Sequence, residues 1–459
     1  MNPSASLAAL WQLAQLPEQA LACADLTGGD PVHPSSFAVA TAAQSTIAAA
    51  ALAACELGHL RGTPRQRVAV DAVHAAAECL GWFSLDGREP QLWDKFSGLY
   101  RARDGWVRVH ANFRHHREGA LRLLGLNPES ADRNAAEQAM AQWDGLAFEQ
   151  AAADAGLVAT ALRSFAQWDA TAQGQALATQ PLFTITRIGE APPRALPPLT
   201  PAQRPLEGVR VLDLTRILAG PVGGRALAAY GADVMLVNAP HLPNIEAIAD
   251  TSRGKRSVLL DLRAAGDRAA MDRLLAQTHA IVQGYRPGGL PALGYGPEQV
   301  ATQRPGSVYV SLSAYGTRGP WKDRRGFDSL VQAAMGFNLA EAEAAGDAQR
   351  PRPLPMQILD EATGYLIAFG AAAALRRQQL EGGSWHVQLS LAQTGHWIRH
   401  LGRVAGGFAA VPPALEPFKE THPSGFGLLC ALRHSARLSR TPAAWLRPSE
   451  PPGHSPARW

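Results

Sequence analysis

The sequence predicts an α/β protein with a doubly wound parallel sheet and a smaller α+β domain. Residues 205–261 have the pattern strand, turn, helix, strand. Further short apolar runs follow at 258–262, 280–283 and 308–312, with helical segments between them. Strands that alternate with helices at this spacing are typical of a parallel sheet. The smaller domain is indicated by a hairpin pattern around Asp104-Gly105 and by helical patterns in 131–175.

The first strand–helix–strand unit predicts where a ligand would bind. Val209, Val211 and Leu212 begin a strand whose carboxyl end turns polar. Pro221 suits the first turn of the helix that follows, and Gly231 suits its end. A right-handed crossover makes the two strands parallel. Because ligands bind at the carboxyl ends of such strands, residues 215–221 are expected to face the active site.

This unit does not match a nicotinamide dinucleotide site. Its glycines occur in the order A-G-P-V-G-G, whereas the dinucleotide fingerprint is G-x-G-x-x-G. Asn238 stands where the acid that binds the ribose would end the second strand. We therefore expect another ligand.

Composition excludes several classes of function. The 459 residues are 46% hydrophobic and 18% charged, which is typical of a globular protein. The formal charge of +4 suits an anionic small molecule, and no basic run of the kind found in nucleic-acid tails is present. The four cysteines form no CxxC pair, so we expect no disulfide framework, no metal site and a cytoplasmic location. The apolar run 45–55 is too short to span a membrane.

The chain divides into three predicted regions. A proline-rich linker at 191–205 separates residues 1–200 from 201–400, and residues 401–459 read as an extended, wrapping tail. Residues 45–76 resemble residues 364–395 in order and nearly in spacing. Each copy is an alanine-rich helix, a polar turn and an alternating strand, so an internal repeat is predicted.

Several motifs in the second region carry a family resemblance. They are PLEGVRVLDLTRILAGP (205–221), GADV (231–234), RGKRSVLLDL (253–262), YRPG (285–288), SxSAYGxxGP (311–320) and the helix that contains Asp360. In this order the chain resembles the class III CoA-transferases, the family of formyl-CoA transferase and the carnitine CoA-transferases. The resemblance covers about residues 205–395. It implies a Rossmann-like large domain and transfer of CoA from an acyl-CoA to a small carboxylic acid.

The resemblance implies that Asp360 is the catalytic nucleophile. A carboxylate that attacks a thioester forms a mixed anhydride, which is a reactive acyl donor. The N-terminus of a helix would keep Asp360 ionised and donate N–H groups to the oxyanion. The alternative is an acid that only caps the helix or complements its dipole.

Positions equivalent to the family's CoA contacts are Leu218, Ala239, Leu259, Gly284, Tyr285 and Arg325. Arg325 would meet a phosphate and Tyr285 would stack near the adenine. Alternatively, Leu259 is an ordinary core residue and Arg325 lies on the surface. Three positions depart from the family pattern, namely Asn238, Ala239 and Gly284. These changes reduce the number of polar contacts with CoA. Arg253 and Arg286 are candidates to replace them.

The order of the segments also departs from the family. Residues 33–200 resemble a C-terminal half and 205–395 an N-terminal half, so two halves are predicted to be fused in permuted order. In the first copy of the repeat the nucleophile position falls near Thr41 or Ala42 and has no carboxylate. The family's interlocked dimers imply a homodimer, or an intramolecular pair of halves.

Two other functions compete with CoA transfer. The first is a catalytically inactive acyl-CoA-binding protein. The second is an acyl-CoA racemase, which would need a His–Asp pair to move a proton. Related racemases carry His before the Asp of a G-x-D motif, but Phe327 stands there in this chain. The sequence does not identify the donor and acceptor acids.

Overall fold

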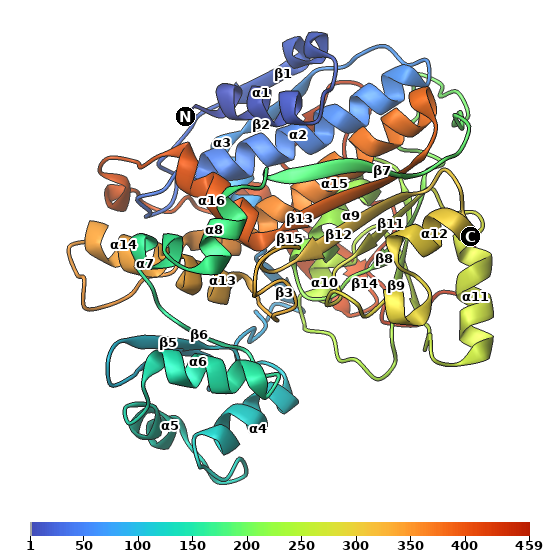
Figure 1. Cartoon of the computed structure of the whole chain (residues 1–459). Helices are drawn as coiled ribbons and strands as arrows, with labels where there is room; N and C mark the ends of the chain where they lie inside the picture. Colours follow the sequence, from blue (N-terminus) through green and yellow to red (C-terminus); the bar gives the residue numbers. More distant parts are fainter. Residues whose placement is uncertain (1) are drawn as a thin grey trace.

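A seven-stranded sheet forms the centre of the computed structural model, which describes residues 2–459 (Figure 1). Six strands are parallel, and β7 is antiparallel to its neighbour β13. The α/β fold class is therefore confirmed. In spatial order the strands are β10 (Lys255–Leu259), β9 (Asp233–Asn238), β8 (Arg210–Leu214), β11 (Ala280–Gln283), β12 (Val308–Ser313), β13 (Ser384–Ser390) and β7 (Phe183–Gly189).

Helices cover both faces of this sheet because the strands are apolar on both sides. Val211 and Val282 belong to a core that also contains α9 (Ala219–Ala229) and α15 (Ile358–Glu381). Leu212 and Ile281, one residue away in each strand, belong to a second core. That core is closed by α11 (Ala265–Leu275) and α12 (Pro297–Gln303). Side chains that alternate between two cores are expected for a doubly wound sheet.

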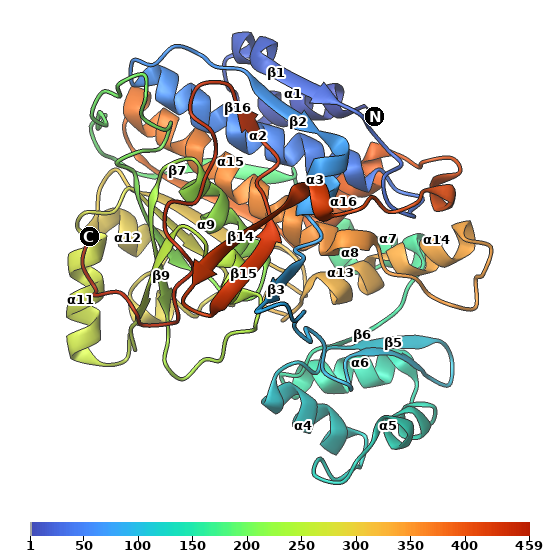
Figure 2. The same ribbon diagram turned by 180° about the vertical axis from the view of Figure 1, so that it is seen from behind.

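The helix–strand repeat is present as two similar units packed against each other. One unit is α2 (Val39–Leu60), β2 (Val68–Asp71) and α3 (Ala72–Glu78), and the other is α15, β13 and α16 (Leu391–Leu401). Helices α2 and α15 lie side by side in the largest core (Figures 1 and 2). Both are long and apolar enough to cross a membrane by length and composition, and the apolar 18-residue stretch of each is wholly buried inside the protein.

The other elements of the first 80 residues flank α2. They are α1 (Pro3–Leu13) and β1 (Ala24–Thr27), and β1 pairs with β2 in parallel. The short strand β16 (Arg437–Leu438), near the end of the chain, completes this small sheet.

A small lobe projects from the main body (Figures 1 and 2). The predicted hairpin is present in it as β4 (Gly98–Arg101) and β5 (Trp106–Val109). Strand β6 (Ala159–Ala161) pairs with β5, and the lobe has its own apolar core. Its helices are α4 (Arg114–Leu123), α5 (Arg133–Met140) and α6 (Gly145–Asp154).

Short helices connect the lobe and the sheet to the long helices. They are α7 (Phe165–Asp169), α8 (Ala172–Ala178), α10 (Ile248–Thr251), α13 (Asp328–Met335) and α14 (Phe337–Ala344).

The last 60 residues include a hairpin as well as extended chain. Strands β14 (Lys419–Ser424) and β15 (Gly427–Leu432) form the hairpin, which pairs with β3 (Phe83–Leu85). The tail then runs along the edge strand β10, where the Ser455 N–H donates to the Ser257 carbonyl at 2.8 Å. The tail therefore covers an edge that would otherwise be open to pairing with another chain.

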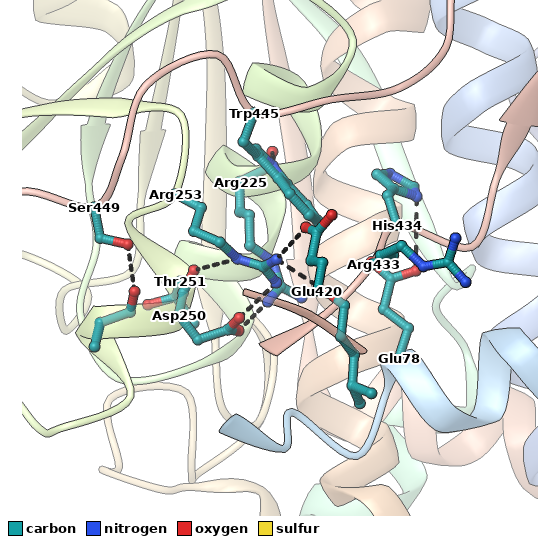
Figure 3. Close-up of polar contacts among 12 residues, drawn as sticks. Glu78, Arg225, Asp250, Thr251, Arg253, Glu420, Arg433, His434, Trp445 and Ser449 are labelled. Carbon is teal, nitrogen blue, oxygen red and sulfur yellow. Dashed lines mark hydrogen bonds and ion pairs between the residues drawn. The ribbon is translucent and has the colours of Figure 1, made fainter. Parts of the chain in front are cut away.

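A buried charge cluster joins the tail to α9 and α10 (Figure 3). Asp250 pairs with Arg225 and with Arg253, and Arg253 also lies 3.1 Å from Glu420. The Trp445 ring stacks over the Arg253 guanidinium at 3.8 Å. The expectation that Arg253 compensates in CoA binding is therefore wrong, because this side chain is 4% exposed and fully paired.

Candidate active site

A cavity of about 600 Å³ opens at the carboxyl ends of β8, β9, β11 and β12. Residues 216–219 of the first turn line it, as the strand–helix–strand pattern predicted. Most of the wall is apolar, from side chains such as Leu214, Val237 and Leu312. Asp360 lines the same cavity. Asp261 also lines it but is paired with Arg263, so the fold places one unpaired carboxyl group, that of Asp360, in the crevice where α/β sheets bind ligands.

Asp360 lies in the first turn of α15 and is 7% exposed. The chain enters this helix through Met356 and Gln357, whose φ angles of 71° and 46° lie in the left-handed region. Such a conformation costs energy for residues other than glycine, so the surrounding structure must hold it. No hydrogen bond within residues 2–459 reaches the Asp360 carboxyl oxygens. The group is therefore free to react with a molecule in the cavity.

A second carboxyl group, that of Asp328, holds the start of α15. Its Oδ2 accepts the Asp360 N–H at 3.0 Å, and its Oδ1 accepts the Gln332 amide. Asp328 is 0% exposed, and burial raises its pKa to about 6. Asp328 therefore caps α15 and places a second ionisable group beside Asp360.

The expectation that the helix N-terminus keeps Asp360 ionised is contradicted by its surroundings. Burial, and then the neighbouring Asp328, raise the pKa of Asp360 well above its ordinary value. Desolvation and a like charge both disfavour the ionised form. The N–H of Asp360 donates to Asp328, and no N–H within residues 2–459 donates to the Asp360 carboxyl group.

The first copy of the repeat has the same kind of helix cap, but no carboxyl group stands at the position equivalent to Asp360. Asp30 accepts the N–H of Ala40 at 2.9 Å and that of Thr41 at 2.8 Å, at the start of α2. Asp30 therefore corresponds to Asp328, and Thr41 to Asp360. Gly28-Gly29-Asp30 matches Gly326-Phe327-Asp328 as a Gly-x-Asp motif. The cap thus occurs in this chain both with and without the candidate nucleophile.

Five of the six predicted CoA contacts lie together around this cavity. The exception is Leu259, which is 36% exposed and packs against Gly453 in the tail. Its neighbours Leu260 and Leu262 line the cavity instead. Successive side chains point to opposite sides of a strand, so a shift of one residue moves the predicted contact away from the site. The five residues that line the cavity are Leu218, Ala239, Gly284, Tyr285 and Arg325.

The sequence did not predict that the lobe contributes to this cavity. Phe113, His115 and His116, at the start of α4, form part of its wall. The Arg325 Nη1 donates to His116 Nε2 at 3.1 Å. Arg216 also lines the cavity, and its guanidinium lies 5.5 Å from the centre of the Phe113 ring. The adjacent histidines were visible in the sequence, but only the fold brings them to the strand ends.

Phe327 forms the cavity wall at the position where related racemases carry a histidine. Its ring stacks on His110 with the ring centres 4.0 Å apart. Burial lowers the pKa of His110 to about 3, so this imidazole is neutral. His110 does not line the cavity. The side chain beside Asp328 is therefore a hydrocarbon ring that carries no proton to exchange.

Comparison with known proteins gives a family for part of the chain. Residues 206–404 match the model of CoA-transferase family III. A probable fatty acyl-CoA transferase of Mycobacterium tuberculosis is 32% identical over 239 residues, which are 48% of this chain and 60% of that protein. An acyl-CoA transferase of Gibberella moniliformis is 29% identical over 378 residues, 73% of this chain and 66% of that protein.

A succinate–glutarate CoA-transferase of Agrobacterium fabrum is 31% identical over 207 residues, 41% of this chain and 51% of that protein. Among solved structures, the crystal structure of the Mycobacterium tuberculosis protein is 31% identical and has a TM-score of 0.39. The match covers 44% of this chain and 59% of that one. The chain thus spans less than two thirds of the length of each of these relatives.

Proposed function

We propose that this chain, whose residues 206–404 match the model of CoA-transferase family III, is an acyl-CoA:carboxylate CoA-transferase with Asp360 as its nucleophile. The observation that carries the proposal is the position of Asp360. Its carboxyl group has no hydrogen-bond partner within residues 2–459 and faces a cavity at the carboxyl ends of the parallel strands. Helix caps normally bind backbone N–H groups, and here Asp328 fills that role.

The proposed reaction begins when Asp360 loses its proton. The carboxylate attacks the carbonyl carbon of the thioester, the C–S bond breaks, and CoA leaves as the thiolate. The acceptor carboxylate then replaces the donor acid in the resulting aspartyl anhydride. The thiolate attacks the acyl carbon of the acceptor, which forms the new thioester and releases the Asp360 carboxylate. An apolar cavity supports such a sequence because it excludes water, which would hydrolyse the anhydride.

Coenzyme A is proposed to bind along the strand ends. Leu218, Ala239 and Gly284 would give the apolar or close-packed contacts, and Tyr285 would stack with the adenine. Arg325, together with Arg286 on the same wall, would attract the negative charge of the phosphates. Leu259 is not part of this proposal because it points away from the cavity.

The relatives' names indicate the range of substrates to test. Two are named for acyl-CoA or fatty acyl-CoA, and one for succinate and glutarate. We propose an acyl-CoA donor and a small carboxylic acid acceptor, and a cytoplasmic location. We also propose that the region before residue 200 acts as the second half of an intramolecular pair, because its lobe and its α2 complete the surroundings of α15.

The nucleophile is tested by exchange of labelled CoA between an acyl-CoA and a free acid. Asp360→Ala is expected to abolish exchange, because no other group in the proposal can form the anhydride. Glu361→Gln is the matched control. Glu361 is the next acid of the same turn, 1% exposed, and does not line the cavity. Full exchange by Asp360→Ala, or equal losses in both variants, would refute the assignment.

A second candidate function is acyl-CoA binding without transfer. It is favoured by the raised pKa of Asp360, because a protonated carboxyl group is a poor nucleophile. Hydroxylamine trapping separates the two functions. A transferase incubated with acyl-CoA gives a hydroxamate on the peptide that contains Asp360, which mass spectrometry detects. A protein that binds acyl-CoA in calorimetry but forms no hydroxamate is a binder.

A further inference from the structure

A second large cavity, of about 1040 Å³, lies between the hairpin β14–β15, the tail and the first repeat unit (Figures 2 and 3). It shares no lining residue with the active-site cavity. Thr27 and Asp71 line it, and they are the last residues of the parallel strands β1 and β2. Ser313, which ends β12 beside the other repeat unit, lines the active-site cavity in the same way. Each repeat unit therefore has a cavity at the carboxyl ends of parallel strands, where such sheets bind ligands.

The wall of this second cavity carries an excess of positive charge. Most of it comes from residues 421–449, which contain four arginines and no Asp or Glu. Three of these arginines, Arg433, Arg437 and Arg447, line the cavity. None of the three forms an ion pair within residues 2–459. Arg433 donates to the Pro417 carbonyl, but that neutral group does not balance its charge.

The two acids of the wall do not neutralise these arginines. Asp71 caps α3, where its Oδ1 accepts the N–H groups of Val73 and His74, each at 3.0 Å. Glu420 lies 3.1 Å from Arg253 in the charge cluster of Figure 3. Both acids are therefore already engaged. Unpaired cations gathered in a concave site favour an anionic ligand.

The inner wall has a hydrogen-bond donor without an acceptor. His434 lines the cavity and is 8% exposed, and burial lowers its pKa, so the ring is neutral. Its Nδ1 accepts the N–H of Ala436 at 3.2 Å, which places the ring proton on Nε2. This Nε2 is buried and has no partner within residues 2–459. Because a buried donor without an acceptor is costly, this wall, like the arginines, lacks an acceptor.

The size and the apolar part of the cavity indicate an organic anion. Cavities that bind organic molecules usually measure about 300–1,000 Å³. The side chains of Phe418 and Leu429 line this one, and the Phe418 ring is held by stacking on His74 with ring centres 4.5 Å apart. A phosphate monoester carries about 1.5–2 negative charges near pH 7, whereas a carboxylate carries one. Three unpaired arginines therefore suit phosphate better, and the planar guanidinium matches two phosphate oxygens at once.

We propose that this second cavity binds a phosphorylated organic molecule. Arg433, Arg437 and Arg447 hold its phosphate groups, and Phe418 and Leu429 contact its apolar part. The site is a binding site and not a second catalytic centre, because Thr41 has replaced the carboxyl group of this repeat unit and does not line the cavity. The inference is independent of the proposed transferase activity, because no residue is common to the two cavities.

Equilibrium dialysis of the full chain tests the proposal. The probes are adenosine diphosphate, ribose 5-phosphate and glycerol 3-phosphate, with inorganic phosphate and adenosine for comparison. At least one phosphorylated probe is expected to bind about tenfold more tightly than inorganic phosphate and than adenosine. Arg437→Met and Arg447→Met should each weaken that binding about tenfold or more, as expected for lost hydrogen bonds to a charged group. Arg440→Met is the matched control, because this exposed arginine of the same segment does not line the cavity.

Two further variants separate this site from the active site. Asp360→Ala should bind the probe normally, whether or not Asp360 is the nucleophile. Tyr285→Ala changes only the active-site cavity. If Tyr285→Ala abolishes binding and Arg437→Met does not, the probe occupies the active site and the proposal is overturned. Binding of none of the three phosphorylated probes at millimolar concentration, equal affinity for inorganic phosphate, or equal losses in Arg437→Met and Arg440→Met overturns it as well.

Discussion

The carboxyl pair at the start of α15 predicts an unusual response to Asp328→Asn. The Asn side chain can still accept the N–H of Asp360, but it carries no charge. Because Asp328 is one of the two causes that raise the pKa of Asp360, the variant should ionise Asp360 at lower pH. A substitution beside the nucleophile is therefore expected to increase activity between about pH 6, above which Asp328 is ionised, and the raised pKa of Asp360.

The expected size follows from the geometry. The Asp328 Oδ2 lies 3.0 Å from the Asp360 nitrogen, which places the two carboxyl groups on the order of 6 Å apart. At an effective dielectric constant of about 20, two unit charges at that distance repel by about 3 kcal/mol. That energy corresponds to roughly a hundredfold change in an ionisation equilibrium. We expect kcat/KM to rise by up to this factor above about pH 6, where Asp328 is ionised in the unaltered protein.

The assay measures kcat/KM for CoA exchange from about pH 5 to about pH 9. The pH dependence of kcat/KM reports the ionisations of the free protein. In the unaltered protein kcat/KM should rise with pH, because the nucleophile is the deprotonated form. Asp328→Asn should move that rise to lower pH. Asp30→Asn is the matched control, because it makes the same change in the equivalent cap of α2, beside Thr41, which has no carboxyl group to titrate. An unchanged pH profile in Asp328→Asn, with a loss of stability equal to that of the control, would refute the reasoning.

Three further predictions concern stability. Asp360→Asn should stabilise the protein increasingly as pH rises above about 4, because the folded carboxyl group keeps a proton that the unfolded chain has already released; urea unfolding at two pH values checks this, and a constant difference contradicts it. Lys255→Met should cost about 3–5 kcal/mol by leaving Asp213, which is 0% exposed, without its partner at 2.8 Å. The double variant Asp213→Leu/Lys255→Met should recover part of that loss in the same denaturation assay. Gly364→Ala should cost about 1–3 kcal/mol, because its Cβ would lie 2.6 Å from Val222 where α15 crosses α9. Gly266→Ala, on the open face of α11, should instead stabilise by about 0.5–1 kcal/mol in thermal unfolding.

Local patterns were sufficient to predict the sheet, whereas the choice of Asp360 came from the family resemblance. Apolar runs that end in polar turns identify strands and their ligand-binding ends without any long-range information. The predicted strand at 258–262 lies at 255–259 instead. The contact at Leu259 was inferred from the family resemblance, and it failed because this side chain faces the tail. Because side chains alternate along a strand, a small error in register is enough to reverse the face.

The other errors arose from contacts between distant segments. The ionisation of Asp360 depends on Asp328, which is 32 residues earlier in the chain, and on the depth of burial. Arg253 is unavailable because Glu420 and Trp445 come from the tail. The lobe reaches the cavity from more than 200 residues before Arg325. Sequence patterns report the period of an element, but they do not report which elements will meet.

The packing of α2 against α15 has a consequence for biosynthesis. Helix α2 leaves the ribosome about 300 residues before α15 is complete, an interval of about 15–60 s at usual elongation rates. During that interval a 22-residue apolar helix lacks the surface that buries it. The nascent chain should therefore depend on a holding chaperone, and fragments that end before Ile358 should aggregate, whereas co-expression with the missing part should restore solubility.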